Sequence, residues 1–236
     1  MADTRKHGTV GPPMSRGEVF GGLLYLPFYV FLLGYLLTVV LDALGLRLAA
    51  STANLVYFLV NFLLIALVFH RWLIVSLGNI SHRFWPFVQA IILGFVFYYA
   101  LAWLLNWVLA LLGWTVSSPN DRYIDALAQG NYWLMVCCTV LLAPLVEETL
   151  FRGLIFGNLH PTGRVLAYAM SALLFAALHV WQYVGQVGWG NTLLTAVAYL
   201  PAGVALGWTY EKADTIWAPI VVHSLINAVS MGILHG

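Results

Sequence analysis

The chain has 236 residues, of which 62% are hydrophobic and only 8% are charged. Soluble domains usually carry about 25% charged residues, so this composition excludes an ordinary soluble domain and indicates an integral membrane protein. The formal net charge of +1 gives no indication of a nucleic-acid or acidic partner.

The N-terminal residues 1–18 are polar and lack a short apolar core followed by a small-residue cleavage site. We therefore expect an exposed N-terminal tail rather than a signal peptide. Residues 19–236 are expected to form one transmembrane helical domain. Its two neighbouring cysteines, Cys137 and Cys138, lie in an apolar run and are expected to be packing residues.

The apolar segments predict an all-α fold, a polytopic integral membrane helical bundle. A spanning helix needs about 20 apolar residues, and about seven segments qualify or nearly do. The third is long, which leaves an eighth membrane element open, and the polar connection at 115–131 is expected to hold a short surface helix. The predicted spans are 19–46, 52–78, 84–113, 132–158, 164–184, 192–210 and 215–234.

The distribution of lysine and arginine predicts the orientation, because these residues are enriched in cytoplasmic segments. With the N-terminus in the cytoplasm, the outer loops hold only Arg47 and Arg122. A multi-pass protein with a cytoplasmic N-terminus is therefore expected. The inner segments then hold Arg5, Lys6, Arg16, Arg71, Arg83, Arg164 and Lys212.

Three predicted spans carry polar residues of the kinds used in catalysis. Residues four apart share a helix face, so the spacing places Glu148 beside Arg152, Phe175 beside His179, and His223 beside Asn227. Glu147 is offset by about 100° from Glu148, so the two carboxylates need not act alike. The residues are Glu147, Glu148 and Arg152 in the fourth span, Phe175 and His179 in the fifth, and His223 and Asn227 in the seventh.

These residues are expected to meet near the middle of the membrane. From the helical rise of about 1.5 Å per residue, they lie at similar distances from turns that the orientation places on one side. A charged side chain at bilayer depth costs free energy, and such residues usually have a functional role. An ion pair between Glu148 and Arg152 would be a structural explanation, but it leaves Glu147 unexplained. A proton pathway is an alternative use of such residues.

The sequences "EETLFR" at 147–152, "FAALH" at 175–179 and "HSLIN" at 223–227 resemble the three motifs of one family. This is the CAAX-protease and bacteriocin-processing (CPBP, or Abi) family, which includes the Ras-converting CAAX endopeptidases. The resemblance covers roughly 130–234, which would be the protease core, and every motif position is matched.

The resemblance implies an intramembrane endopeptidase. By position, Glu147 would be the base that activates water, assisted by His179, and His223 with Asn227 would stabilise the oxyanion. Glu148 and Arg152, with Phe175 nearby, would support the site. Hydrolysis without a serine or cysteine nucleophile needs such a base and such donors.

Metal dependence has two possible answers at this level. Glu147 or Glu148 with His179 and His223 would supply the three protein ligands that a catalytic zinc ion typically takes. The helical HExxH spacing of many zinc proteases is absent, and the resemblance favours a glutamate-dependent enzyme without a cofactor.

The expected partners are the lipid bilayer and a protein or peptide substrate with a membrane-embedded or lipidated segment. The expected location is the inner membrane of a prokaryotic cell. Two further functions stay open: a non-proteolytic scaffold or immunity protein of the same family, and a proton-coupled transporter. The transporter would be expected to show inverted repeats, and the sequence shows none.

Overall fold

The structure, a computed structural model, describes residues 8–235 and confirms an all-α polytopic bundle. The described helices fit the predicted spans closely, and six are long and apolar enough to cross a membrane. Those six extend over Arg16–Ala43, Ala50–His82, Phe84–Leu111, Tyr132–Leu159, Arg164–Tyr183 and Trp189–Ala213. The seventh segment forms α11 (Trp217–His235), whose described apolar part, Trp217–Gly232, is shorter.

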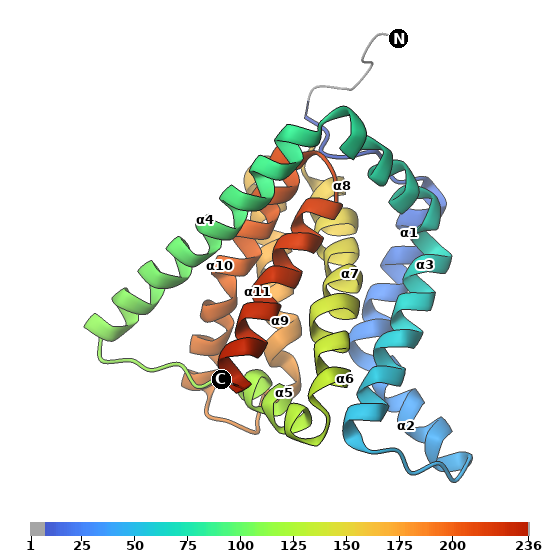
Figure 1. Ribbon diagram of the computed structural model, residues 1–236, viewed down its shortest axis with the longest axis vertical. Helices are drawn as coiled ribbons and strands as arrows, with labels where there is room; N and C mark the ends of the chain where they lie inside the picture. The colour runs from blue at the N-terminus through green and yellow to red at the C-terminus, as the bar shows by residue number, and fades with distance from the viewer. Residues whose placement is uncertain (1–7, 236) are drawn as a thin grey trace.

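The first three spans form the two flanks of the molecule (Figure 1). The first consists of α1 (Arg16–Pro27), a π-helical turn η1 (Phe28–Leu32) and α2 (Leu33–Ala43). It is followed by α3 (Ala50–His82) and α4 (Phe84–Leu111). The long third span is thus one unbroken helix, and it contributes no eighth element.

The fourth span, Tyr132–Leu159, lies in the middle of the bundle, as Figure 1 shows. In its most apolar stretch 61% of the residues are buried, against 11% to 44% for the other five long spans. It consists of α6 (Tyr132–Val136), η2 (Cys137–Leu142), α7 (Ala143–Glu148), η3 (Thr149–Phe156) and α8 (Gly157–Leu159). The predicted charged residues therefore lie on the helix best shielded from lipid.

The remaining helices surround this central span. They are α9 (Arg164–Val180) with the 3₁₀ turn η4 (Trp181–Tyr183), then α10 (Trp189–Ala213) and α11. The predicted surface helix is α5 (Pro119–Gly130), which begins with Ser118 as its N-cap and lies at the end of the bundle away from the N-terminus (Figure 1).

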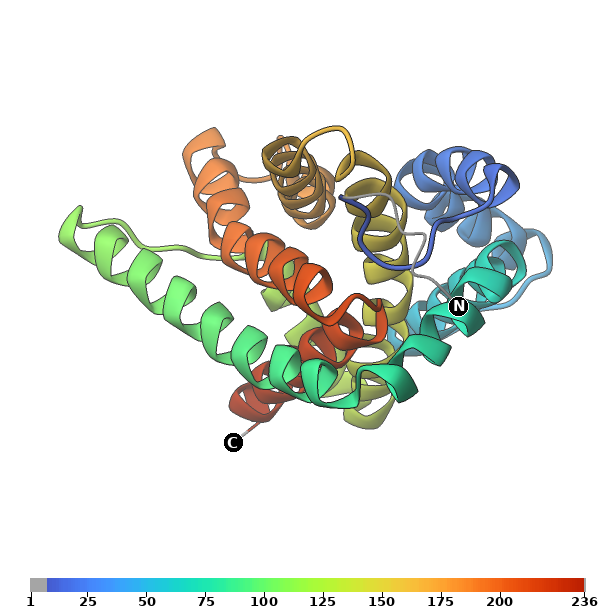
Figure 2. The same ribbon diagram turned by 90° about the horizontal axis from the view of Figure 1, so that it is seen from above.

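The N-terminal segment differs from the expected exposed tail where it is described; residues 1–7 lie outside the described part. Residues 8–15 cross the opposite end of the bundle from α5 (Figure 2). Val10 and Gly11 are buried, and the amide of Gly11 donates to the Asp214 carboxylate at 2.7 Å. Ser15 and Glu18 then form a capping box that starts α1. Polar composition alone did not indicate this docking.

Candidate active site

The fourth span changes its helical register on both sides of Glu147 and Glu148. The segments η2 and η3 are π-helical, and α7 between them carries both glutamates. Single π turns within helices are rare and are frequently found at functional sites. The structure thus singles out the same stretch that the motifs did.

The register change frees one backbone carbonyl, that of Thr139. The amide of Ala143 donates to Cys138, five residues back, and in that register Thr139 would pair with residue 144. This residue is Pro144, which has no N–H. The side-chain amide of Asn227 donates to the Thr139 carbonyl instead, at 2.7 Å. Pro144 thus leaves the Thr139 carbonyl able to accept the hydrogen bond from Asn227, and this bond connects α11 to the central span.

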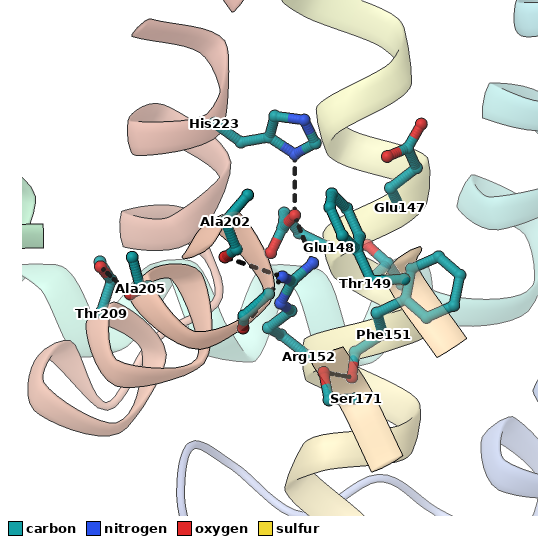
Figure 3. A network of polar contacts seen from close by, with 12 residues as sticks. Glu147, Glu148, Thr149, Phe151, Arg152, Ser171, Ala202, Ala205, Thr209 and His223 are labelled. Atoms are coloured by element: carbon teal, nitrogen blue, oxygen red, sulfur yellow. Dashed lines mark hydrogen bonds and ion pairs between the residues drawn. The ribbon is translucent and has the colours of Figure 1, made fainter. Parts of the chain in front are cut away.

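Glu148 is the centre of a buried polar network (Figure 3). Its Oε1 accepts from Arg152 Nη1 at 2.9 Å and lies 2.8 Å from His223 Nδ1. The side chains of Glu148 and Arg152 are both fully buried. Arg152 Nη2 also donates to the carbonyls of Ala202 and Gly203 on α10, each at 3.3 Å. The pair thus connects the central span to α10 and α11. Charged side chains inside membrane proteins typically pair with one another or with backbone carbonyls in this way.

Phe175 separates this network from the second histidine. Its ring lies under the guanidinium group of Arg152, with Cζ 4.4 Å from the ring centroid, a cation–π contact. The ring centroids of His179 and His223 lie 4.6 Å and 5.7 Å away. The aromatic side chain thus fixes the spacing between the two imidazoles.

Glu147 points away from Glu148, and Figure 3 shows the two carboxylates on different sides of the helix. The carboxylate atom Oε2 of Glu147 is buried and has no hydrogen-bond partner among the described residues. It lies 3.8 Å from Nε2 of His179. That separation is too long for a direct hydrogen bond, and a water molecule can bridge groups at such distances.

The tautomer of His179 follows from its other contact. Nδ1 lies 2.8 Å from the backbone carbonyl of Phe175. A carbonyl oxygen can only accept, so Nδ1 carries the proton and, in the neutral ring, Nε2 is an acceptor. The site therefore presents two acceptors, Glu147 Oε2 and His179 Nε2, to the space between them.

A cavity of about 1000 Å³ connects these residues, at the upper end of the range for ligand pockets. The predicted residues that line it are Glu147, Phe175, His179, His223 and Asn227. Glu148 and Arg152 are not among its lining residues and lie behind them. The structure thus brings the predicted set together and divides it into a cavity-facing group and a supporting pair.

The possible zinc ligands are divided between two contacts in this structure. Within residues 8–235, no group of three or more His, Cys, Asp or Glu side chains is placed to hold a metal ion. Nδ1 of His223 is directed to Glu148, and Nε2 of His179 lies 3.8 Å from Oε2 of Glu147.

Sequence reasoning missed Tyr199 on α10. Its ring stacks on that of His179, with centroids 4.2 Å apart and an interplanar angle of 27°. Its hydroxyl donates to Asp121 on α5 at 2.9 Å and accepts from Asn120 at 3.2 Å. Tyr199 thereby connects the surface helix to the site. It belongs to none of the three motifs, so no spacing pointed to it.

Comparison with known proteins agrees with the motif analysis. Residues 129–229 match the family described as "Type II CAAX prenyl endopeptidase Rce1-like". The resemblance expected from the three motifs is thereby confirmed for this region, which contains all seven predicted site residues.

Two curated proteins are similar to parts of the chain. A protein named "UPF0177 protein YxdF" from Lactococcus lactis is 33% identical over 87 residues, 37% of this chain and 42% of the relative. One named "Putative membrane peptidase YdiL" from Bacillus subtilis is 27% identical over 95 residues, 40% of this chain and 34% of the relative. The chain thus matches less than half the length of either relative. No solved structure matches the chain.

Proposed function

We propose that this protein is an intramembrane endopeptidase that hydrolyses a peptide bond in a membrane-associated or lipidated substrate. The observation that carries the proposal is the unpartnered, buried Oε2 of Glu147, which faces His179 Nε2 across 3.8 Å within the cavity. A buried carboxylate oxygen without a partner costs free energy. Among the described residues, Oε2 of Glu148 is also without one, but only Glu147 lines the cavity, where water can reach it. Activation of a water molecule between Glu147 Oε2 and His179 Nε2 accounts for this unpartnered oxygen. The Rce1-like region and the relative named a membrane peptidase support the same class of activity.

In the proposed reaction, Glu147 removes a proton from this water molecule, and the oxygen of the water attacks the scissile carbonyl carbon. A tetrahedral oxyanion forms, and the proton held by Glu147 passes to the leaving amine as the C–N bond breaks. His179, fixed by Phe175, accepts the second hydrogen bond of the water and orients it. Holding water in an attacking geometry removes part of the barrier that free water would face.

The oxyanion would be stabilised from α11. Asn227 uses one amide hydrogen on Thr139 and retains a second for the oxyanion. His223 directs Nδ1 to Glu148, so donation from Nε2 needs a ring protonated on both nitrogens. The Glu148 carboxylate beside it stabilises that cation. Donors aimed at developing negative charge are commonly a large catalytic contribution.

The experiment compares Glu147→Gln with the wild type at equal protein levels in a strain that lacks the protein. New peptide termini in membrane fractions are measured by mass spectrometry. Termini that form with the wild type and with Asp42→Asn, an exposed carboxylate on α2, but not with Glu147→Gln, are the expected result. Identical profiles for Glu147→Gln and the wild type would overturn the proposal and favour a non-proteolytic scaffold.

A further inference from the structure

The cavity extends from the site toward one end of the bundle. Its lining residues come from eight ranges, and none lies among the five residues of a span nearest the N-terminal segment. The ranges are 29–41, 50–58, 98–106, 116–127, 135–147, 175–183, 198–202 and 223–231. By helix rise, Glu147 lies about 22 Å from the start of the fourth span at Tyr132. The site is thus the inner end of a cavity that extends toward α5.

Some lining residues toward α5 are strongly exposed, whereas those at the site are buried. Glu147 and His223 are each 6% exposed at the inner end. Tyr35 on α2 and Tyr123 on α5 are 69% and 51% exposed at the other end. The mouth of the cavity therefore lies at the end of the bundle that carries α5.

The opposite end is closed by packing and hydrogen bonds. The N-terminal segment lies across it (Figure 2), where Tyr210 donates to the Val10 carbonyl at 3.2 Å and Trp72 Nε1 donates to Pro12 at 2.8 Å. Asp214 binds both the Gly11 amide and Arg83, the latter at 2.9 Å. The lining residues of the cavity do not extend to this end.

The positive charges mark this closed end as cytoplasmic. Lysine and arginine are enriched on the cytoplasmic side of membrane proteins. Of the described Lys and Arg residues outside the mid-membrane Arg152, only Arg47 and Arg122 lie toward the open end. Those toward the closed end are Arg16, Arg71, Arg83, Arg164 and Lys212.

We infer that the cavity opens on the extracytoplasmic side and admits a polypeptide segment that has already crossed the membrane. This inference rests on the proposed function and assigns its substrate class: an exported, membrane-anchored chain cleaved in the outer half of the bilayer. A segment confined to the cytoplasm would meet the closed end. Among the cavity-lining residues, Asp121 and Glu147 are the acids and there is no lysine or arginine. The cavity thus favours neutral or basic segments over acidic ones.

The test measures sidedness independently of proteolysis. In a background with Cys137→Ala and Cys138→Ala, single cysteines are placed at the open end (Thr38→Cys, Tyr123→Cys) and at the closed end (Ser81→Cys, Thr162→Cys). All four positions are exposed. Intact cells are treated with a membrane-impermeant maleimide. We expect labelling of the first pair at once and of the second pair only after permeabilisation. The reverse pattern would overturn the inference.

A second readout comes from the new peptide termini of wild-type cells. Those that depend on Glu147 should lie in exported segments, and termini in cytoplasmic segments alone would also overturn the inference. If no terminus depends on Glu147, the proposed protease function fails while the labelling result still decides where the cavity opens. The two failures are therefore distinguishable.

Discussion

The side-chain amide of Asn227 donates a 2.7 Å hydrogen bond to the backbone carbonyl of Thr139. This carbonyl is free because Pro144 cannot donate to it. In Pro144→Ala the new N–H competes for Thr139, and Asn227 loses its fixed orientation. We expect the rate of terminus formation to fall about 10-fold, since small displacements of positioning groups cost that much or more.

Protein stability separates this effect from misfolding. An interior proline costs a helix about 3 kcal/mol, so thermal unfolding of Pro144→Ala in detergent should stay at or above the wild-type temperature. Pro219→Ala is the matched control, because Pro219 is the third residue of α11 and lies in its first turn. Its activity should be unchanged. An active Pro144→Ala variant would show that the Thr139 bond does not position Asn227.

Tyr199 is predicted to hold His179 through its ring rather than its hydroxyl group. Tyr199→Ala removes the ring stacked 4.2 Å from the imidazole, and we expect about a 10- to 100-fold loss of rate from the freed histidine. Tyr199→Phe keeps the ring and loses the bonds of the hydroxyl to Asp121, Asn120 and Ser118, so its rate should stay within a few-fold. Equal losses in both variants would assign the effect to the Asp121 connection.

The buried pair of Glu148 and Arg152 should be needed for stability first. Arg152→Met leaves a buried carboxylate without its cation, and breaking such a pair typically costs about 3–5 kcal/mol. Thermal unfolding in detergent measures this loss. Arg164→Met is the control, because Arg164 has 60% of its side chain exposed, and its loss should change the unfolding temperature much less.

A double variant separates structure from catalysis in this network. Glu148→Leu with Arg152→Met contains no unpaired charge, so it should recover much of the lost stability. It should stay inactive, because His223 has lost the carboxylate at Nδ1. Recovery of activity along with stability would show that Glu148 has no role toward His223.

The sequence predicted the helices and the proximity of the polar residues well because both depend on short-range regularities. Long apolar runs located the helices, and four-residue spacing placed Glu148 beside Arg152 and Phe175 beside His179. The proximity of Glu147 to His179 followed from matched depth in two spans. These are properties of individual helices, and they persist whatever the bundle packing.

Features that depend on packing between distant helices could not be predicted. Tyr199 reaches His179 only because α10 lies beside α9, and residues 8–15 dock only because α10 ends at Asp214. The π-helical turns were also not predicted, because hydrogen bonds between residues five apart leave no recognisable pattern in the spacing of apolar residues. The sequence contains Pro144, but its effect on the Thr139 carbonyl depends on Asn227 of α11.

Metal removal is predicted to leave activity unchanged. His223 is engaged by Glu148, and no set of three ligands is placed for a metal within residues 8–235. Treatment of solubilised membranes with a zinc chelator should therefore not slow the formation of new peptide termini. A zinc protease added to the same membranes is the control, and the chelator should abolish its activity. Loss of activity that zinc restores would contradict the proposed glutamate mechanism.

Close contact between α9 and α10 places Arg152 against its α10 acceptors, and Gly203 makes this contact possible. A Cβ at residue 203 would lie 2.7 Å from Ala172 Cβ and 2.8 Å from its Cα, so the backbone would have to move. We expect Gly203→Ala to lose about 1–3 kcal/mol of stability by overpacking, measured by thermal unfolding in detergent. Gly78→Ala on the exposed face of α3 meets nothing within 4 Å and should gain up to about 1 kcal/mol. Equal unfolding temperatures for the two variants would show that the helices can separate without cost, and that Gly203 does not set the position of Arg152.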